Sequence, residues 1–220
     1  MIEFSNIDGQ EIFQATLDTL TMTGFSLLFT VLLGLPLGVI LFLTSRGQVL
    51  QQAALYATLS FIVNILRSVP FIILLIVLIP FTLFLVGTSL GVPGTIPPLV
   101  IGTAPFFARL VENVLRELDK GIIEACQAMG AKTYQTVLFA LLPEALPGLL
   151  AAMTVTTIAL VSYAAMSGVI GGGGLGDLAL RFGYQRFQTD VMIVTVTILI
   201  ILVQLIQFLG DKLVARFSHK

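Results

Sequence analysis

The chain has 220 residues, of which 57% are hydrophobic and 10% are charged, and its formal net charge is −1 at pH 7. This composition, with a mean hydropathy of +1.04, excludes an ordinary soluble domain. The net charge gives no indication of a basic surface that binds a nucleic acid. The single cysteine, Cys126, excludes an internal disulfide and any multi-cysteine metal site. The one histidine, His219, is expected to be a solvated residue of the C-terminal tail, so we expect neither a metal nor a cofactor.

Several apolar runs exceed the length of about 20 residues that crosses a hydrocarbon layer of about 30 Å. We therefore expect an all-α integral membrane protein, with residues 1–220 forming one transmembrane domain. The first residues are acidic, and the first apolar run is too long for a signal-peptide core, so the first helix is expected to be retained as an anchor. The five expected spans are 20–43, 56–86, 95–115, 144–169 and 191–209.

The second run is too long for one simple span and is interrupted by Arg67 and Pro70. We interpret it as an interfacial helix at 50–66 followed by a crossing part from Val69 to Val86. A sixth span at 50–66 is the alternative. Arg67 either extends toward the membrane surface or faces a cavity, and the sequence does not distinguish these two positions.

The third and fourth spans carry different polar patterns. Arg109, Glu112 and Arg116 share one helical face at the inner end of the third span, which predicts a structural ion-pair set with Arg109 reaching toward the interface. The fourth span is rich in small and hydroxyl residues, which indicates close helix packing and, as an alternative, a lining for a translocation path. No Asp or Glu lies near the middle of any expected span, and this counts against ion-coupled transport.

Lysine and arginine in the loops predict the orientation. One side of the membrane has only Arg181 and Arg186. We therefore place the N-terminus outside and the C-terminus in the cytoplasm, with residues 117–143 forming a cytoplasmic insertion. A short basic tail from 211 to 220 is expected to lie on the membrane surface. The cytoplasmic side collects Arg46, Arg116, Lys120, Lys132, Lys212, Arg216 and Lys220.

The insertion at 117–143 is predicted to be a compact pair of short helices. Asp119 is an N-cap candidate for a helix at 121–129, and Gly130 suits the left-handed position that ends it. Thr133 is expected to cap a second helix at 134–142, whose apolar face is formed by Val137, Leu138 and Leu141. These features alone are compatible with a docking platform for a partner or with a plain interfacial loop.

The glycine-rich segment 171–176 formally matches a dinucleotide-binding pattern, but it follows a membrane helix instead of a β-strand. We interpret it as a flexible external loop at which a binding protein docks. Around Lys132, the sequence lacks the Gly-Lys-Ser/Thr adjacency of a phosphate-binding loop. ATP dependence, if present, must therefore come from another chain.

In the insertion, Glu124-Ala125-Cys126 is followed by three residues, Gly130, nine residues, and then Ala140-x-Leu142-Pro143. This spacing resembles the EAA loop of permease subunits of bacterial binding-protein-dependent ABC importers, whose pattern is EAA, three residues, G, nine residues and I-x-LP. Cys126 stands where the family has Ala, and Ala140 stands where it has Ile. The resemblance implies that the loop is a coupling helix that fits a groove on a separate ATPase subunit. The residues implied in this contact are Glu124, Ala125, Cys126, Gly130, Ala131, Leu142 and Pro143.

Other segments resemble the methionine-uptake permeases of this family, namely residues 64–71, 165–168, 171–177 and 207–211. The resemblance implies a type I importer permease that is a multi-pass protein of the bacterial inner membrane and forms a homodimer around one central path. It also implies two protein partners, namely an ATPase subunit in two copies and an extracytoplasmic methionine-binding lipoprotein. Contact with membrane lipid is implied as well. Met166 corresponds to a gate position, although it would be equally ordinary as a core residue. The residues expected on the path or its gate are Met166, Ser162, Arg67, Ser68 and Pro70.

We therefore expect a non-catalytic permease subunit of an ATP-driven importer of methionine, as the D- or L-enantiomer. The alternative is an ATP-independent secondary carrier or channel for a small solute, which needs no ATPase. A membrane-embedded enzyme is the third class, but no pair of ionisable residues has the pattern of a catalytic site. The substrate rests on the resemblance alone.

Overall fold

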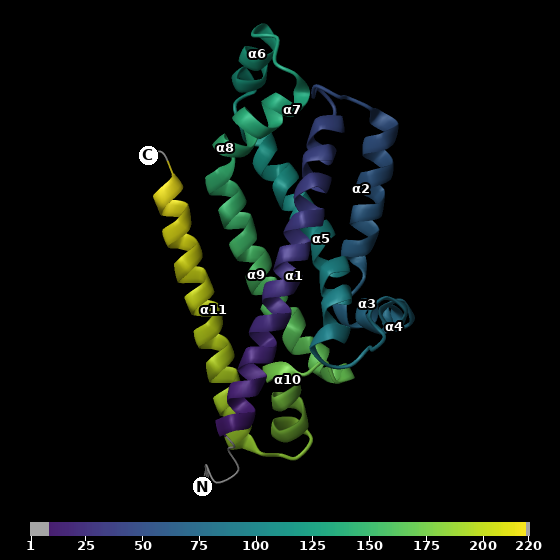
Figure 1. Ribbon diagram of the computed structural model, residues 1–220, viewed down its shortest axis with the longest axis vertical. Helices are drawn as coiled ribbons and strands as arrows, with labels where there is room; N and C mark the ends of the chain where they lie inside the picture. Colours follow the sequence, from purple (N-terminus) through teal and green to yellow (C-terminus); the bar gives the residue numbers. More distant parts are fainter. Residues whose placement is uncertain (1–8, 219–220) are drawn as a thin grey trace.

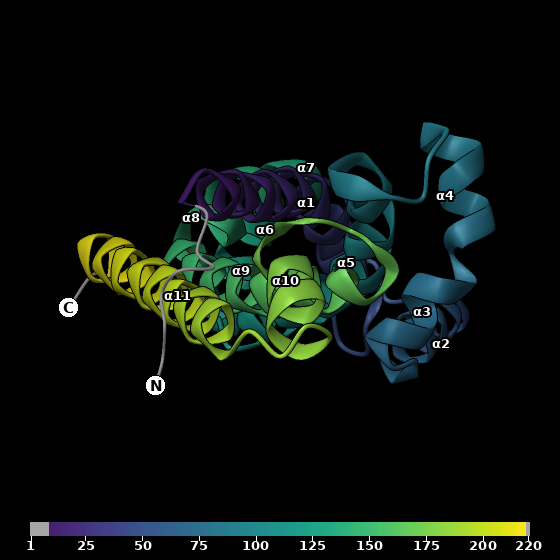
Figure 2. The ribbon, with the colours of Figure 1, turned by 90° about the horizontal axis from the view of Figure 1, so that it is seen from below.

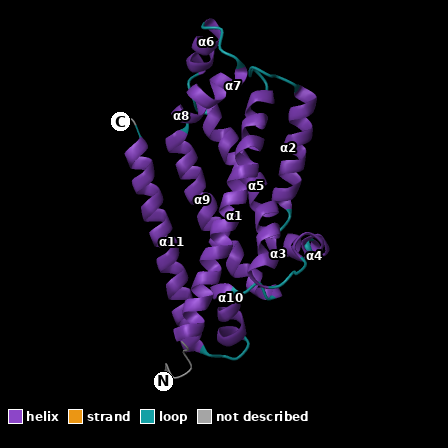
Figure 3. Ribbon diagram, in the orientation of Figure 1, coloured by secondary structure: helices purple, strands orange, loops and turns teal. Residues whose placement is uncertain are grey.

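The computed structural model describes residues 9–218, and all regular structure in that range is helical (Figures 1 and 3). His219 and Lys220, whose roles were predicted above, lie outside the described residues. Within the described residues, two π-helical turns, at Val137–Leu141 and Ala179–Tyr184, and one 3-10 turn, at Gly168–Ile170, interrupt the α-helices. The α-helices are α1 (Gly9–Thr44), α2 (Ala53–Ser68), α3 (Phe71–Val77), α4 (Ile79–Val86), α5 (Gly91–Arg116), α6 (Lys120–Ala128), α7 (Thr133–Thr136), α8 (Leu142–Glu144), α9 (Leu146–Ser167), α10 (Gly174–Leu178) and α11 (Thr189–Phe217).

Four helices of the described part are long and apolar enough to cross a membrane: α1, α5, α9 with its 3-10 extension, and α11. The bent pair of α2 and α3 makes a fifth span when it is counted as one, which agrees with the five predicted spans. The helices extend beyond the apolar runs, because backbone hydrogen bonds continue after the hydrocarbon layer ends. Thus α1 already begins at Gly9, and α11 continues to Phe217 through most of the segment predicted as a tail.

The path of the second span differs from the prediction. α2 runs lengthwise beside α1 and α5, and the chain then bends by 101° into α3, which lies across the bundle (Figure 1). Figure 2 shows α4 standing away from the other helices. The bend falls at Val69, whose extended conformation (φ −80°, ψ 125°) is the one that a following proline, here Pro70, imposes. The predicted interfacial helix at 50–66 is therefore wrong, because this segment is the lengthwise part of the span.

α1 and α5 form the most extensive helix pair of the bundle. α1 remains one helix through Pro36, and Gly34 and Gly38 face α5. The Thr30 and Thr103 hydroxyls form a buried hydrogen bond of 2.7 Å between the two helices. Residues four positions apart lie on one helical face, so the two glycines let the α5 backbone approach α1 closely.

A side chain at Gly38 is expected to separate α1 from α5. A Cβ there would lie 2.5 Å from the Ala108 carbonyl oxygen and 2.6 Å from the Val111 Cβ, both on the other helix. Overpacking of this kind costs about 1–3 kcal/mol, and the rigid backbone contact favours the upper end. Gly38→Leu should therefore lower the apparent melting temperature of the purified protein in detergent. Gly24→Leu is the matched control, because a Cβ at Gly24 meets nothing within 4 Å; equal melting temperatures for the two variants would contradict the prediction.

The glycine-rich segment is packed and not a flexible external loop, which corrects that expectation. Leu175 is fully buried, and its N–H donates a 2.9 Å hydrogen bond to the Thr19 hydroxyl of α1. A Cβ at Gly176 would collide with the Ala165 backbone of α9. The glycines thus allow α10 to pack closely against α1 and α9. No strand precedes them in the described part of the chain, so the dinucleotide-binding context is missing there as predicted.

The two described ends of the chain lie at opposite ends of the bundle (Figure 1). α6 and α7 lie at the end at which α11 terminates, while α10 lies at the end at which α1 begins. The arrangement agrees with the predicted topology, in which the N-terminus is outside and the 117–143 loop shares the cytoplasmic side with the C-terminus.

Candidate functional site

The first half of the 117–143 loop is a well-terminated helix, α6. The Asp119 carboxylate accepts a 2.8 Å hydrogen bond from the Gly121 N–H, which confirms it as the N-cap. At the other end, Gly130 has φ +73°, and its N–H donates to the Gln127 carbonyl at 2.9 Å. The Ala131 N–H donates to the Cys126 carbonyl at 3.0 Å, which completes a Schellman ending that requires the left-handed glycine.

The faces of α6 differ. Ile122 and Ile123 are half-buried and pack on the core cluster at this end of the bundle. Glu124 and Ala125 are exposed, and Cys126 is partly exposed. The helix is thus fixed to the bundle by one side and presents Glu124 and Ala125 on the other, whereas Cys126, four residues after Ile122, lies toward the packed side.

The second half of the loop differs in detail from the prediction. Thr133 is not the cap: α7 follows Lys132, whose backbone N–H donates to the Gln135 side-chain oxygen at 2.8 Å. The predicted helix 134–142 is split into α7, a π-helical turn and α8. Pro143 has no N–H to offer to the carbonyl four residues earlier and its ring crowds that carbonyl, which gives a reason for the wider turn before it.

The burial of this second half shows which residues support the loop. Of the predicted apolar face, Val137 and Leu141 are buried, whereas Leu138 is 54% exposed. Phe139 is 75% exposed. Leu142 is half-buried and Pro143 is exposed. Exposed apolar side chains grouped at one end of a bundle mark a contact surface, and Met129 and Tyr134 of the same loop are exposed as well.

A buried ionic group lies between α2 and α5 at the base of this loop. Glu112 is 1% exposed and forms ion pairs with Arg109 at 2.6 Å and with Arg116 at 2.7 Å. The predicted ion-pair set is thus present, but Arg109 does not reach toward the interface. It donates instead to the Ser60 hydroxyl at 2.8 Å and to the Asn64 side-chain oxygen at 3.0 Å, both on α2.

The residues that α2 contributes to this ionic group were not predicted from the sequence. The Tyr56 hydroxyl donates to Glu112 at 3.1 Å. Tyr56, Ser60 and Asn64 recur every four residues, and this spacing is the signal that predicts one polar helical face. We call the six residues the Glu112 cluster: Tyr56, Ser60, Asn64, Arg109, Glu112 and Arg116.

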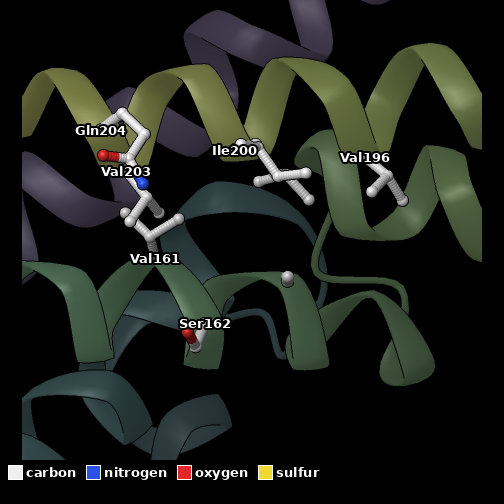
Figure 4. Close-up of a pocket in the computed structure, with 8 residues that line it drawn as sticks. Val161, Ser162, Val196, Ile200, Val203 and Gln204 are labelled. Atoms are coloured by element: carbon white, nitrogen blue, oxygen red, sulfur yellow. The ribbon is translucent and has the colours of Figure 1, made fainter.

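The residues predicted on the path lie in different places within one protomer. Ser162 of α9 lines a groove of about 300 Å³ together with Val196 and Ile200 of α11 (Figure 4). Its hydroxyl bonds to the Ile158 carbonyl of its own helix at 3.3 Å. Met166 is 46% exposed near the outer end of α9 and is therefore not a core-filling residue within this chain.

Arg67 lines a separate, smaller cavity of about 120 Å³ at the bend between α2 and α3. Ser68 bonds to the Asn64 carbonyl, and Pro70 is the residue before α3. Phe71 stacks on Tyr163 with ring centroids 4.4 Å apart, which joins the bend to α9. The structure therefore gathers Arg67, Ser68 and Pro70 at the bend, and places Ser162 in another groove.

Comparisons with known proteins agree on one family. Residues 31–220 match the family model described as the binding-protein-dependent transport system inner membrane component. The D-methionine transport system permease protein MetI of Escherichia coli K12 is 52% identical over 92% of this chain and 94% of its own length. The methionine import system permease protein MetP of Bacillus subtilis is 50% identical, with 94% of each chain covered.

Solved structures give the same result. A chain from the inward-facing MetNI methionine ABC transporter superposes with a TM-score of 0.94 at 48% identity, covering 97% of this chain and all of that one. A chain from an amino acid ABC transporter crystallised with histidines gives a TM-score of 0.74 at 19% identity, with 94% of both chains covered. The second likeness concerns the fold alone.

Proposed function

Because the chain belongs to the family of binding-protein-dependent transport system inner membrane components, we propose that it forms the membrane path of an ATP-driven methionine importer. It is the permease subunit, a multi-pass protein of the bacterial inner membrane, and it is not itself an enzyme. ATP hydrolysis belongs to a separate ATPase subunit, and two copies of the permease form the importer.

The observation that carries this function is α6 at the cytoplasmic end of the bundle. Its ends are fixed by the Asp119 cap and by the left-handed Gly130, so its exposed face is held in one orientation. We assign the ATPase contact to Glu124, Ala125 and Cys126 on this helix, with Gly130 and Ala131 forming the turn. Leu142 and Pro143 support the return of the chain into α9.

The core beneath α6 connects this contact to the membrane helices α5 and α9. Ile122 and Ile123 pack on a cluster that contains Val111 and Leu115 of α5 and Leu149 of α9. Protein interiors are close-packed and transmit displacement. ATP binding draws the ATPase subunits together, α6 moves with them, and α5 and α9 tilt as a unit between inward- and outward-facing arrangements.

The path itself is assigned to the surface that α9 and the α2–α3 bend leave exposed. Met166 acts as a gate at the outer end, and Ser162, Arg67, Ser68 and Pro70 line the passage between the two copies. Ser162 and Arg67 lie in separate cavities of one protomer, so a shared passage requires the second copy to complete it.

Substrate selection is assigned largely to an extracytoplasmic methionine-binding lipoprotein that delivers the solute to the outer end. The described membrane helices offer no acidic and basic pair positioned to hold both charged groups of an amino acid. The enantiomer that is carried therefore depends on the binding protein, and both D- and L-methionine belong in the test.

The test is reconstitution of the chain with the ATPase subunit that co-purifies with it, in vesicles supplied with the binding protein. Uptake of labelled D- and L-methionine is measured with ATP inside or absent, against an unrelated amino acid as a control. We expect a stoichiometric ATPase in the preparation and uptake only with ATP. Methionine uptake that is equal with and without ATP would instead establish an ATP-independent carrier or channel.

A further inference from the structure

Arg67 lies within the hydrocarbon layer of the membrane. Its guanidinium carbon is 6.0 Å from the centre of the Phe106 ring on α5. α5 has 26 residues and is therefore about 39 Å long, and Phe106 lies about 15 Å along it from Arg116. A layer about 30 Å thick encloses that position.

Arg67 has no anionic partner in the described part of the chain. Arg109 and Arg116 share Glu112, whereas the Arg67 side chain makes no hydrogen bond and no ion pair within residues 9–218 and is exposed. A guanidinium that faced acyl chains at this depth would be strongly unfavourable, and such residues instead face a water-filled cavity or a bound group. The exposed side of Arg67 therefore belongs to an aqueous path.

The cavity beside Arg67 accepts only one end of a small solute. Its volume of about 120 Å³ is well below the 300–1,000 Å³ or so of pockets that enclose whole ligands. Phe106 and the stacked Phe71–Tyr163 pair supply apolar walls. Gly102 also lines the cavity, and its lack of a side chain keeps the space beside Phe71 free, because a Cβ there would lie 3.2 Å from the Phe71 ring.

The charges around the cavity favour an anionic group. The polar face of α2 continues from Arg67 through the Glu112 cluster to the cytoplasmic end of the bundle. This stretch contains three arginines and one glutamate, which leaves two excess positive charges. A guanidinium binds a carboxylate through two parallel N–H···O bonds, which suits an arginine that lines a small cavity.

We propose that the Arg67 guanidinium is a transient binding station for the carboxylate of the transported amino acid, in the membrane interior between the outer gate and the cytoplasm. The aromatic walls face the rest of the solute, and release follows when the α2–α3 bend moves with α5. The proposal rests on the proposed importer function and adds to it a contact made by the permease itself.

The experiment compares Arg67→Gln and Arg67→Lys with wild type, each reconstituted with the ATPase and binding protein. Loss of a charge-assisted bond should lower ATP-driven uptake of labelled methionine by about tenfold or more in Arg67→Gln, while stimulated ATP hydrolysis continues. Arg67→Lys keeps the charge and should recover part of the uptake. Arg46→Gln removes the same charge from an exposed cytoplasmic residue and is the control.

Three results would overturn the proposal: wild-type uptake in Arg67→Gln, no recovery in Arg67→Lys, or failure of Arg67→Gln to assemble with the ATPase, since an arginine needed for assembly is a structural group. These outcomes are separate from a failure of the proposed function. If the wild-type complex itself shows no ATP-driven methionine uptake, the importer assignment fails before the variants are compared.

Discussion

Glu124→Lys is expected to abolish coupled transport while leaving the protein folded in the membrane. Glu124 is exposed on α6 and makes no ion pair in the described part of the chain, so reversal of its charge removes no internal contact. If Glu124 lies at the proposed ATPase contact, a reversed charge opposes the surface that its carboxylate is proposed to complement. Disruption of a charge pair in such an interface costs about 2–5 kcal/mol, which predicts a loss of uptake of about 30-fold or more.

The measurement is ATP-driven methionine uptake, alongside the amount of ATPase that co-purifies. Glu144→Lys is the matched control, because Glu144 is also exposed at this end but lies on α8, outside the loop. Wild-type uptake in Glu124→Lys, or an equal loss in both variants, would contradict the assigned contact.

A second variant tests the same contact through backbone geometry. Gly130 has φ +73°, and proline is confined near −65°. Gly130→Pro also removes the N–H that donates to the Gln127 carbonyl. The end of α6 should unwind and uncouple ATP hydrolysis from uptake, whereas Gly130→Asn, which tolerates the left-handed region, should retain more of the coupling.

Glu112→Ala is expected to be the most destabilising substitution in the bundle. It leaves Arg109, which is 16% exposed at its side chain, without the only carboxylate that it contacts in the described residues. Removal of one partner of a buried ion pair costs about 3–5 kcal/mol. For a chain of this size, that loss corresponds to a fall in melting temperature of about 6–20 °C.

Thermal unfolding of the purified protein in detergent measures this effect. Glu112→Gln keeps an acceptor for Tyr56 and should lose less stability. Arg116→Gln is the contrasting variant, because the Arg116 side chain is 43% exposed and Glu112 keeps its ion pair with Arg109 when Arg116 is replaced. For a chain of this size, a difference of only a few degrees between the melting temperatures of Glu112→Ala and Arg116→Gln would correspond to about 1 kcal/mol and would contradict the role of Glu112.

The first half of the 117–143 loop was predictable because its signals are local. Capping by Asp119 and the left-handed turn at Gly130 depend on the conformations of neighbouring residues, and both are present as predicted. The π-helical turn before Pro143 was not predicted, because the number of residues in that turn depends on how Val137 and Leu141 are accommodated in the core.

The second span shows the opposite case. Pro70 predicts a break at Val69, and the break is there. We predicted wrongly which of the two segments runs along the bundle, because hydropathy does not show how an apolar helix is oriented relative to the bundle axis. Val63 of α2 is buried in one cluster with Leu41 of α1 and Ala108 of α5, and this packing holds α2 along the bundle, so that α3 is the part that crosses it.

The sequence by itself determined the membrane class, the number of spans, the orientation and the loop that identifies the family, because each depends on composition or on residues close together in the chain. The tertiary structure alone decided the contacts between distant segments. It placed Asn64 against Arg109, Gly176 against α9, and Arg67 at a cavity with no counter-ion among the described residues. Such contacts depend on how helices distant in sequence pack against one another, and local sequence patterns do not specify that packing.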